Sequence, residues 1–156
     1  MTFGIEDDFL AFTRKNEWEI AESISFVTEE GVDVHIKDTG VIEFTPERAG
    51  EKAVVLSCGV HGNETAPIEI CAEIVTEILT GKLTLRHRTL FLFANPASMN
   101  IGQRFVEENM NRLFSGYHSK GQDPFGRETN RERQRAARIE DYVTRFFSLY
   151  PEHERT

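Results

Sequence analysis

Cysteine is scarce in this chain of 156 residues, which contains only Cys58 and Cys71. Two cysteines do not form a disulfide framework. Each stands in an apolar stretch, where a small buried side chain fits. We therefore expect reduced thiols and a cytoplasmic protein.

Long apolar runs are also missing. The longest, Leu90 to Ala94, is far too short to cross a bilayer. Residues 1–8 lack the positive region and the apolar core of a signal peptide. No G-x-G-x-x-G or Walker pattern follows a predicted strand, which excludes the usual nucleotide-binding turns. We expect neither a membrane nor a nucleotide as partner.

Positive charge is in deficit, because 18 lysines and arginines face 26 aspartates and glutamates, for a net charge of −8. An acidic balance disfavours nucleic acids and anionic membrane surfaces, both of which select basic patches. Any anionic ligand must then be held by local arginines that overcome the average field. This charge pattern favours a small-molecule substrate and argues against nucleic acid.

What the chain does contain is the composition of a single globular domain with a real core, 39% hydrophobic and 28% charged. Residues 7–18 predict a short helix. Alternating apolar and polar residues at 24–26, 32–36 and 41–44 predict half-buried strands. Turn residues between them indicate an antiparallel meander.

A βαβ unit follows the meander. The apolar run Ala53–Cys58 predicts a strand covered on both faces, a helix begins near Ala66, and Thr89–Ala94 predicts a second buried strand. Parallel pairing is the default for such a unit. We expect an α/β fold with a mixed, mostly parallel central sheet flanked by helices, and the meander within it or as a separate edge sheet. A loop at 115–127 and a last helix capped by Thr129 complete the prediction.

His61 and Glu64 form an H-x-x-E pair where the first buried strand turns into its helix. Histidine and carboxylate are the usual ligands of catalytic zinc, and this spacing can aim both at one point. The plainer interpretation is a surface histidine beside an acid that favours the N-terminal end of a helix. The location favours the metal site, since open α/β sheets bind ligands at the carboxyl ends of their strands.

Arg104, Asn111 and Arg112 follow the second strand of this unit. Arginine grips carboxylates in a bidentate manner and stays charged at any accessible pH. Each of these residues could equally be an ordinary surface group. Taken with the H-x-x-E pair, they suggest a zinc hydrolase that acts on a small carboxylated amide.

Four ordered motifs resemble the succinylglutamate desuccinylase/aspartoacylase family of zinc carboxypeptidase-like hydrolases. They are G-V-H-G-N-E-T-A-P at 59–67, N-P-A at 95–97, G-Q-R at 102–104 and N-R-L-F at 111–114. Within the family, the resemblance is greatest to the bacterial members that act on N-succinylglutamate. It implies cleavage of that amide to succinate and L-glutamate, the last step of arginine catabolism by the succinyltransferase pathway.

The resemblance also implies roles for single residues. His61 and Glu64 match the first two ligands of one Zn²⁺ ion. Arg104 matches the arginine that polarises the scissile carbonyl and stabilises the oxyanion. Asn111 and Arg112 match the pair that binds a substrate carboxylate.

The family's third zinc ligand, a histidine on a strand after the last helix, and its general base, a later glutamate, have no counterpart before Thr156. His153 and His118 are poor substitutes, and His35 and His87 suit surface positions. Residues 1–156 are therefore expected to form the N-terminal portion of one catalytic domain, inactive by itself. The alternatives are a deacylase or carboxypeptidase for another N-acyl amino acid, or a metal-free binding module.

Overall fold

The computed structural model of the chain describes residues 3–5 and 7–156. The strands are β1 (Ile24–Val27), β2 (Asp33–Asp38), β3 (Val41–Thr45), β4 (Ala53–Cys58) and β5 (Arg88–Phe93). The α-helices are α1 (Phe9–Lys15), α2 (Thr65–Leu79), α3 (Pro96–Asn100) and α4 (Arg131–Phe147). Short 3₁₀ helices cover Met110–Arg112, Tyr117–Ser119 and Glu152–Glu154.

The five strands form one sheet in the order β1-β2-β3-β5-β4. The β4–β5 pair is parallel, as the βαβ prediction required. The pairs β1–β2, β2–β3 and β3–β5 are antiparallel. The expectation of a mostly parallel sheet is therefore wrong for the described residues, because the meander joins the βαβ unit edge to edge through β3 and does not pack as a separate sheet.

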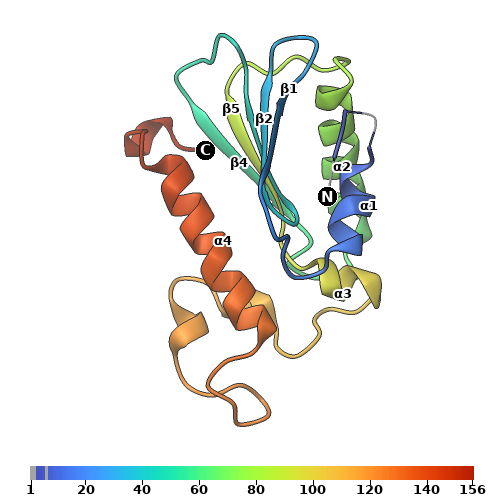
Figure 1. Cartoon of the computed structure of the whole chain (residues 1–156). Helices are drawn as coiled ribbons and strands as arrows, with labels where there is room; N and C mark the ends of the chain where they lie inside the picture. Colours follow the sequence, from blue (N-terminus) through green and yellow to red (C-terminus); the bar gives the residue numbers. More distant parts are fainter. Residues whose placement is uncertain (1–2, 6) are drawn as a thin grey trace.

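Helices cover both faces of this sheet, with α1 and α2 on one side and α4 on the other (Figure 1). Strand β5 contributes to both layers: Phe91 and Phe93 pack in the cluster with α2, whereas Leu90 and Leu92 pack in the cluster with α4. Coverage from both sides explains why this strand is an almost continuous apolar run. No helix in the described part of the chain has the length and apolarity that a bilayer crossing requires.

Strand β4 lies at the edge of the sheet, so the prediction that it is covered on both faces fails at its C-terminal half. Leu56 is 39% exposed, and Ser57 is exposed beside it. The last residues of the chain partly cover the N-terminal half. Thr156 donates to the Ala53 carbonyl at 2.8 Å, and its own carbonyl accepts from Val55 N–H at 2.6 Å.

Helix α4 begins one residue later than predicted. Asn130, not Thr129, is the N-cap residue, and its side chain accepts a hydrogen bond from Arg133 N–H at 2.8 Å. The apolar stripe predicted for this helix is confirmed by Ala136, Ile139 and Phe146, which are buried against the sheet.

A fully buried arginine joins α4 to the sheet. Arg135 donates to the backbone carbonyls of Ala94 at 3.0 Å, Thr39 at 2.6 Å and Phe93 at 3.1 Å. Its Nη1 lies 3.6 Å from Asp38 Oδ2. Burial lowers the pKa of Arg135 to about 10, which still leaves it charged at neutral pH. It therefore ties the β2–β3 turn to the end of β5.

We expect Arg135→Met to lower the free energy of unfolding by about 3 kcal/mol or more, because it leaves three buried carbonyls without their donor and removes one cation from beside Asp38. Urea denaturation of the chain measures this difference. Arg145→Met is the matched control on the same helix. The Arg145 side chain is 73% exposed and, among the described residues, forms an ion pair with Asp141 alone, so its loss should cost less than about 0.5 kcal/mol. Equal losses for the two variants would contradict the structural role of Arg135.

Candidate functional site

The parallel pairing of β4 and β5 brings the two loops that carry the candidate residues together. Ala94 N–H donates to the Cys58 carbonyl and Asn95 N–H donates to the Gly59 carbonyl, both at 2.9 Å. The turn that holds His61 therefore starts directly beside the loop that follows β5. This edge, at the carboxyl ends of both strands, is where ligands bind in open α/β sheets.

Two glycines let the turn after β4 pack against α3. Gly59 has a φ of +66°, and a Cβ at this position would lie 2.1 Å from Met99 Cε. A Cβ on Gly62 would lie 2.2 Å from the backbone carbonyl carbon of Ser98. A larger residue at position 62 would have to move the backbone of α3, and one at position 59 would displace the end of the Met99 side chain and strain its own backbone.

His61 and Glu64 point toward each other. His61 Nδ1 lies 3.0 Å from Glu64 Oε1. The imidazole is buried, whereas the carboxylate side chain is 57% exposed. Glu64 is the N-cap residue of α2, yet its side chain makes no capping hydrogen bond. Glu64 therefore stands at the N-terminal end of a helix, as the plainer interpretation expects, but the histidine beside it is buried and not a surface residue.

The other ring nitrogen of His61 contacts Asn109. His61 Nε2 lies 3.0 Å from Asn109 Oδ1, and the same oxygen accepts a hydrogen bond from Asn111 N–H at 3.1 Å. An oxygen that already accepts from a backbone N–H is correctly identified as the amide oxygen, so Nε2 must be the donor to it. In the neutral imidazole the lone pair then lies on Nδ1, on the side of Glu64.

This arrangement suits a metal ion held by His61 Nδ1 and the Glu64 carboxylate. Two ligand atoms of a tetrahedral zinc ion at about 2.1 Å stand roughly 3.4 Å apart, and Nδ1 and Oε1 are 3.0 Å apart, within a small side-chain adjustment of this value. Asn109 would fix the ring by accepting from its other nitrogen, as partners of metal-bound histidines commonly do. Within residues 3–5 and 7–156, no third histidine, cysteine or carboxylate completes the group.

Asn111 and Arg112 lie in the 3₁₀ helix that follows Asn109 and are exposed. Met110, within this helix, and Leu113, directly after it, anchor it to the core, because both are buried in the cluster with α4. Arg104 lies earlier in the same loop and is also exposed. Among the described residues, no ion pair or side-chain hydrogen bond engages Arg104 or Arg112. The structure thus places Asn111 and Arg112 next to Asn109, the residue that contacts His61. Among the described residues, Arg104 forms no hydrogen bond or ion pair with His61 or Glu64.

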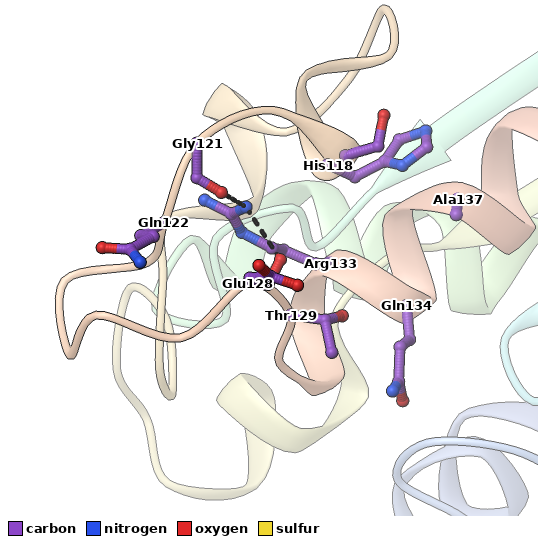
Figure 2. Close-up of a pocket in the computed structure, with 9 residues that line it drawn as sticks. His118, Gly121, Gln122, Glu128, Thr129, Arg133, Gln134 and Ala137 are labelled. Carbon is purple, nitrogen blue, oxygen red and sulfur yellow. Dashed lines mark hydrogen bonds between the residues drawn. The ribbon is translucent and has the colours of Figure 1, made fainter.

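The histidines considered as replacements lie elsewhere. His118 Nε2 is 3.1 Å from Glu140 Oε2 on α4, beside an open hollow of about 730 Å³ (Figure 2). Gly121, Gln122 and Arg133 also line this hollow, and none of the candidate residues does. The His153 side chain is 80% exposed in the C-terminal 3₁₀ helix.

Sequence reasoning missed Asn109. It stands two residues before Asn111, and nothing in its local pattern separates it from a turn residue. Its contact with His61 spans 48 positions of the chain. Only the packing of the loop against the β4 turn reveals it.

The fold and this site define a member of a hydrolase family. Residues 50–155 match the succinylglutamate desuccinylase/aspartoacylase catalytic domain, and the chain belongs to that family. The resemblance drawn from the four motifs is confirmed.

The relatives are desuccinylases. The chain is 55% identical to the succinylglutamate desuccinylase of Idiomarina loihiensis, over 95% of this chain and 42% of the relative. It is 50% identical to that of Shewanella denitrificans, over 94% of this chain and 42% of the relative. The X-ray structure of the Vibrio parahaemolyticus protein matches with a TM-score of 0.82 and 32% identity, over 96% of this chain and 42% of that one. The chain thus spans about two fifths of the length of the curated relatives it matches.

Because the chain matches only 42% of the Idiomarina loihiensis relative, experiments on the complete site need a hybrid protein. In it, the 156 residues replace the matching part of that relative. In this hybrid we expect Asn109→Leu to weaken zinc binding about 10- to 100-fold, because His61 loses the acceptor that orients its ring. Competition with a chromogenic chelator measures the affinity. Gln122→Leu, which removes an exposed amide outside the site, should change it less than about twofold. Unchanged affinity in Asn109→Leu would show that the contact does not orient a metal ligand.

Proposed function

We propose that the chain supplies part of the active site of a zinc-dependent hydrolase that cleaves the amide of N-succinyl-L-glutamate to succinate and L-glutamate. The observation that carries this proposal is the pair His61 and Glu64, whose ligand atoms face each other at 3.0 Å at the carboxyl end of β4. The identity to desuccinylases, 55% over 148 residues in one relative, supports the choice of substrate.

His61 Nδ1 and the Glu64 carboxylate would hold the Zn²⁺ ion, and Asn109 would keep the imidazole in the required orientation. A bound zinc ion would supply Lewis-acid chemistry, lowering the pKa of a bound water to about 7. In the net reaction, the water oxygen bonds to the succinyl carbonyl carbon and the amide C–N bond breaks. The glutamate nitrogen leaves with a proton.

The third ligand and the general base would come from residues that follow Thr156, so the described chain would be the N-terminal portion of one catalytic domain. The edge of β4 supports this idea. The chain's last residues run parallel to β4, with Arg155 bridged to Ala53. A strand continuing in this register would pass Cys58 about five residues later and reach the level of His61.

Arg104 would polarise the scissile carbonyl and stabilise the oxyanion, while Asn111 and Arg112 would bind a carboxylate of the substrate. N-succinylglutamate carries three carboxylates, and both arginines are exposed. Their charges lie in a protein with a net charge of −8, so they would create a local positive region in an acidic background.

We retain the expectation of a cytoplasmic location, which the two free cysteines support. Burial raises the pKa of the Cys58 thiol far above its ordinary value. A buried protonated thiol is chemically inert and suits a reducing compartment.

Two other functions follow from the same observations. An aspartoacylase-like deacylase or a carboxypeptidase would use the same metal pair on another N-acyl amino acid, and a panel of such substrates distinguishes them. A metal-free binding module would fold without zinc. One equivalent of zinc in the hybrid, lost on His61→Ala, supports the enzyme.

The first prediction of this proposal concerns turnover. We expect the hybrid to release succinate and glutamate from N-succinylglutamate, and to lose this activity on chelation. The 156-residue chain alone should bind zinc weakly at most and show no hydrolysis, since no third ligand joins the pair among the described residues. A coupled glutamate assay measures both. Robust turnover by the short chain would contradict the proposed division of the site, and a folded but inactive hybrid would contradict the function.

A second prediction separates the two arginines in the hybrid. Arg104→Met should lower kcat about 100- to 1000-fold with little change in KM, because an oxyanion donor acts in the transition state. Arg112→Met should raise KM about tenfold or more, because it removes charged hydrogen bonds to bound substrate. Arg86→Met, an exposed arginine before β5, serves as control. The reverse pattern, with KM raised by Arg104→Met and kcat lowered by Arg112→Met, would exchange the proposed roles.

A further inference from the structure

Glu132 is a completely buried acid in the first turn of α4. Within the part of the chain that the structure describes, no arginine, lysine or histidine forms an ion pair with it. A buried carboxylate without a cation needs several hydrogen-bond donors to be tolerated. The identity of those donors shows what the charge is used for.

Among the described residues, every donor to Glu132 comes from the segment of the candidate site that follows β5. Oε1 accepts from Asn95 Nδ2 at 2.8 Å and from Val106 N–H at 2.7 Å. Oε2 accepts from Glu107 N–H at 2.8 Å and from Glu108 N–H at 2.5 Å. One side chain thus binds three successive backbone N–H groups and the asparagine that follows β5.

These contacts fix the segment between the candidate residues. Residues 106–108 stand between Arg104 on one side and the run from Asn109 to Arg112 on the other. In the described chain, their N–H groups have no backbone acceptor, so Glu132 supplies the acceptors that a helix or strand would otherwise provide. The segment's conformation therefore depends on a side chain from another element.

Neighbouring residues on α4 support the same segment. Arg133 binds Glu108 in a bidentate manner, with Nε 2.7 Å from Oε2 and Nη2 3.0 Å from Oε1. The hydrogen bonds from Arg133 lower the pKa of Glu108, which keeps this carboxylate charged. Arg133 also donates to the carbonyls of Gly121 and Glu128 (Figure 2). The N-terminal turn of α4 thus holds residues 106–108 in two ways. Glu132 binds their backbone N–H groups, and Arg133 binds the Glu108 side chain.

We propose that Glu132 is a positioning residue for the active site, which holds residues 106–108 so that Arg104, Asn109 and Arg112 keep their places around His61. This inference rests on the proposed function for its catalytic consequence and on the hydrogen bonds alone for its structural one. Glu132 itself touches neither the candidate metal ligands nor the exposed arginines.

Glu132→Gln tests the proposal in the hybrid, because every partner of the carboxylate is a donor. A glutamine keeps the shape and places its NH₂ group against two of those donors. We expect amide hydrogen exchange in peptides covering 104–114 to become at least about tenfold faster, zinc affinity to fall, and kcat to fall about 10- to 100-fold, as for other residues that orient site groups.

Two controls separate positioning from stability and from charge. Ile139→Ala removes a buried side chain from the apolar half of α4 and should destabilise the fold without changing exchange in 104–114 relative to the rest. Glu128→Gln removes the same charge at an exposed position before the helix. Both should keep kcat within about twofold at a temperature where they are folded. If Glu132→Gln does not fold, Glu132→Asp keeps the charge, shortens the reach and should give the same three changes.

Two results would overturn the role of Glu132. One is unchanged hydrogen exchange in 104–114 in the Glu132 variant, and the other is an equal rise in exchange and an equal fall in kcat in Ile139→Ala. A hybrid that does not hydrolyse N-succinylglutamate would instead refute the proposed function. Exchange and zinc affinity in the Glu132 variants would still decide whether this carboxylate holds the loop.

Discussion

The parallel pairing of β4 with β5 determines where every candidate residue lies. It aligns the carboxyl ends of the two strands, so that the turn after β4 and the loop after β5 leave the sheet side by side. The hydrogen bond from Asn95 N–H to the Gly59 carbonyl joins these two loops directly. With antiparallel pairing, His61 and Asn109 would leave from opposite ends of the strands. The rest of the site refines a proximity that the sheet creates.

The two halves of helix α4 stabilise this site in different ways. Its C-terminal half packs Ile139 and Phe146 on the sheet, an apolar contribution to stability. Its N-terminal half buries charges that bind backbone groups of loops and turns. Glu132 binds residues 106–108, and Arg135 binds carbonyls of the β2–β3 turn and of the end of β5. Buried charge is expensive, but the four hydrogen bonds that Glu132 accepts offset this cost and specify one loop conformation.

Much of the fold could be predicted from the sequence, because periodicity reports which residues are buried. Ala53–Cys58 was expected as a strand and is one, and the parallel β4–β5 pair follows from the helix between them. The neighbour of each strand is a different matter, since no pattern in β3 indicates that it pairs with β5. This is why the mostly parallel sheet was wrong.

The candidate site was predictable only in its local part. His61 and Glu64 are three residues apart, and spacing alone suggests that they meet. Asn109 and Glu132 act over long separations, and their sequence neighbourhoods look like solvated polar stretches. The motif resemblance identified the family, whereas the physical connection between the motifs required the packing of α4 against the loop.

The most direct test of the account is a crystal structure of the hybrid grown with zinc, with anomalous diffraction recorded above and below the zinc absorption edge. The account predicts one strong zinc peak about 2.1 Å from both His61 Nδ1 and a Glu64 carboxylate oxygen, with Nε2 still bonded to Asn109. A zinc peak on Nε2, or one remote from both residues, would contradict it.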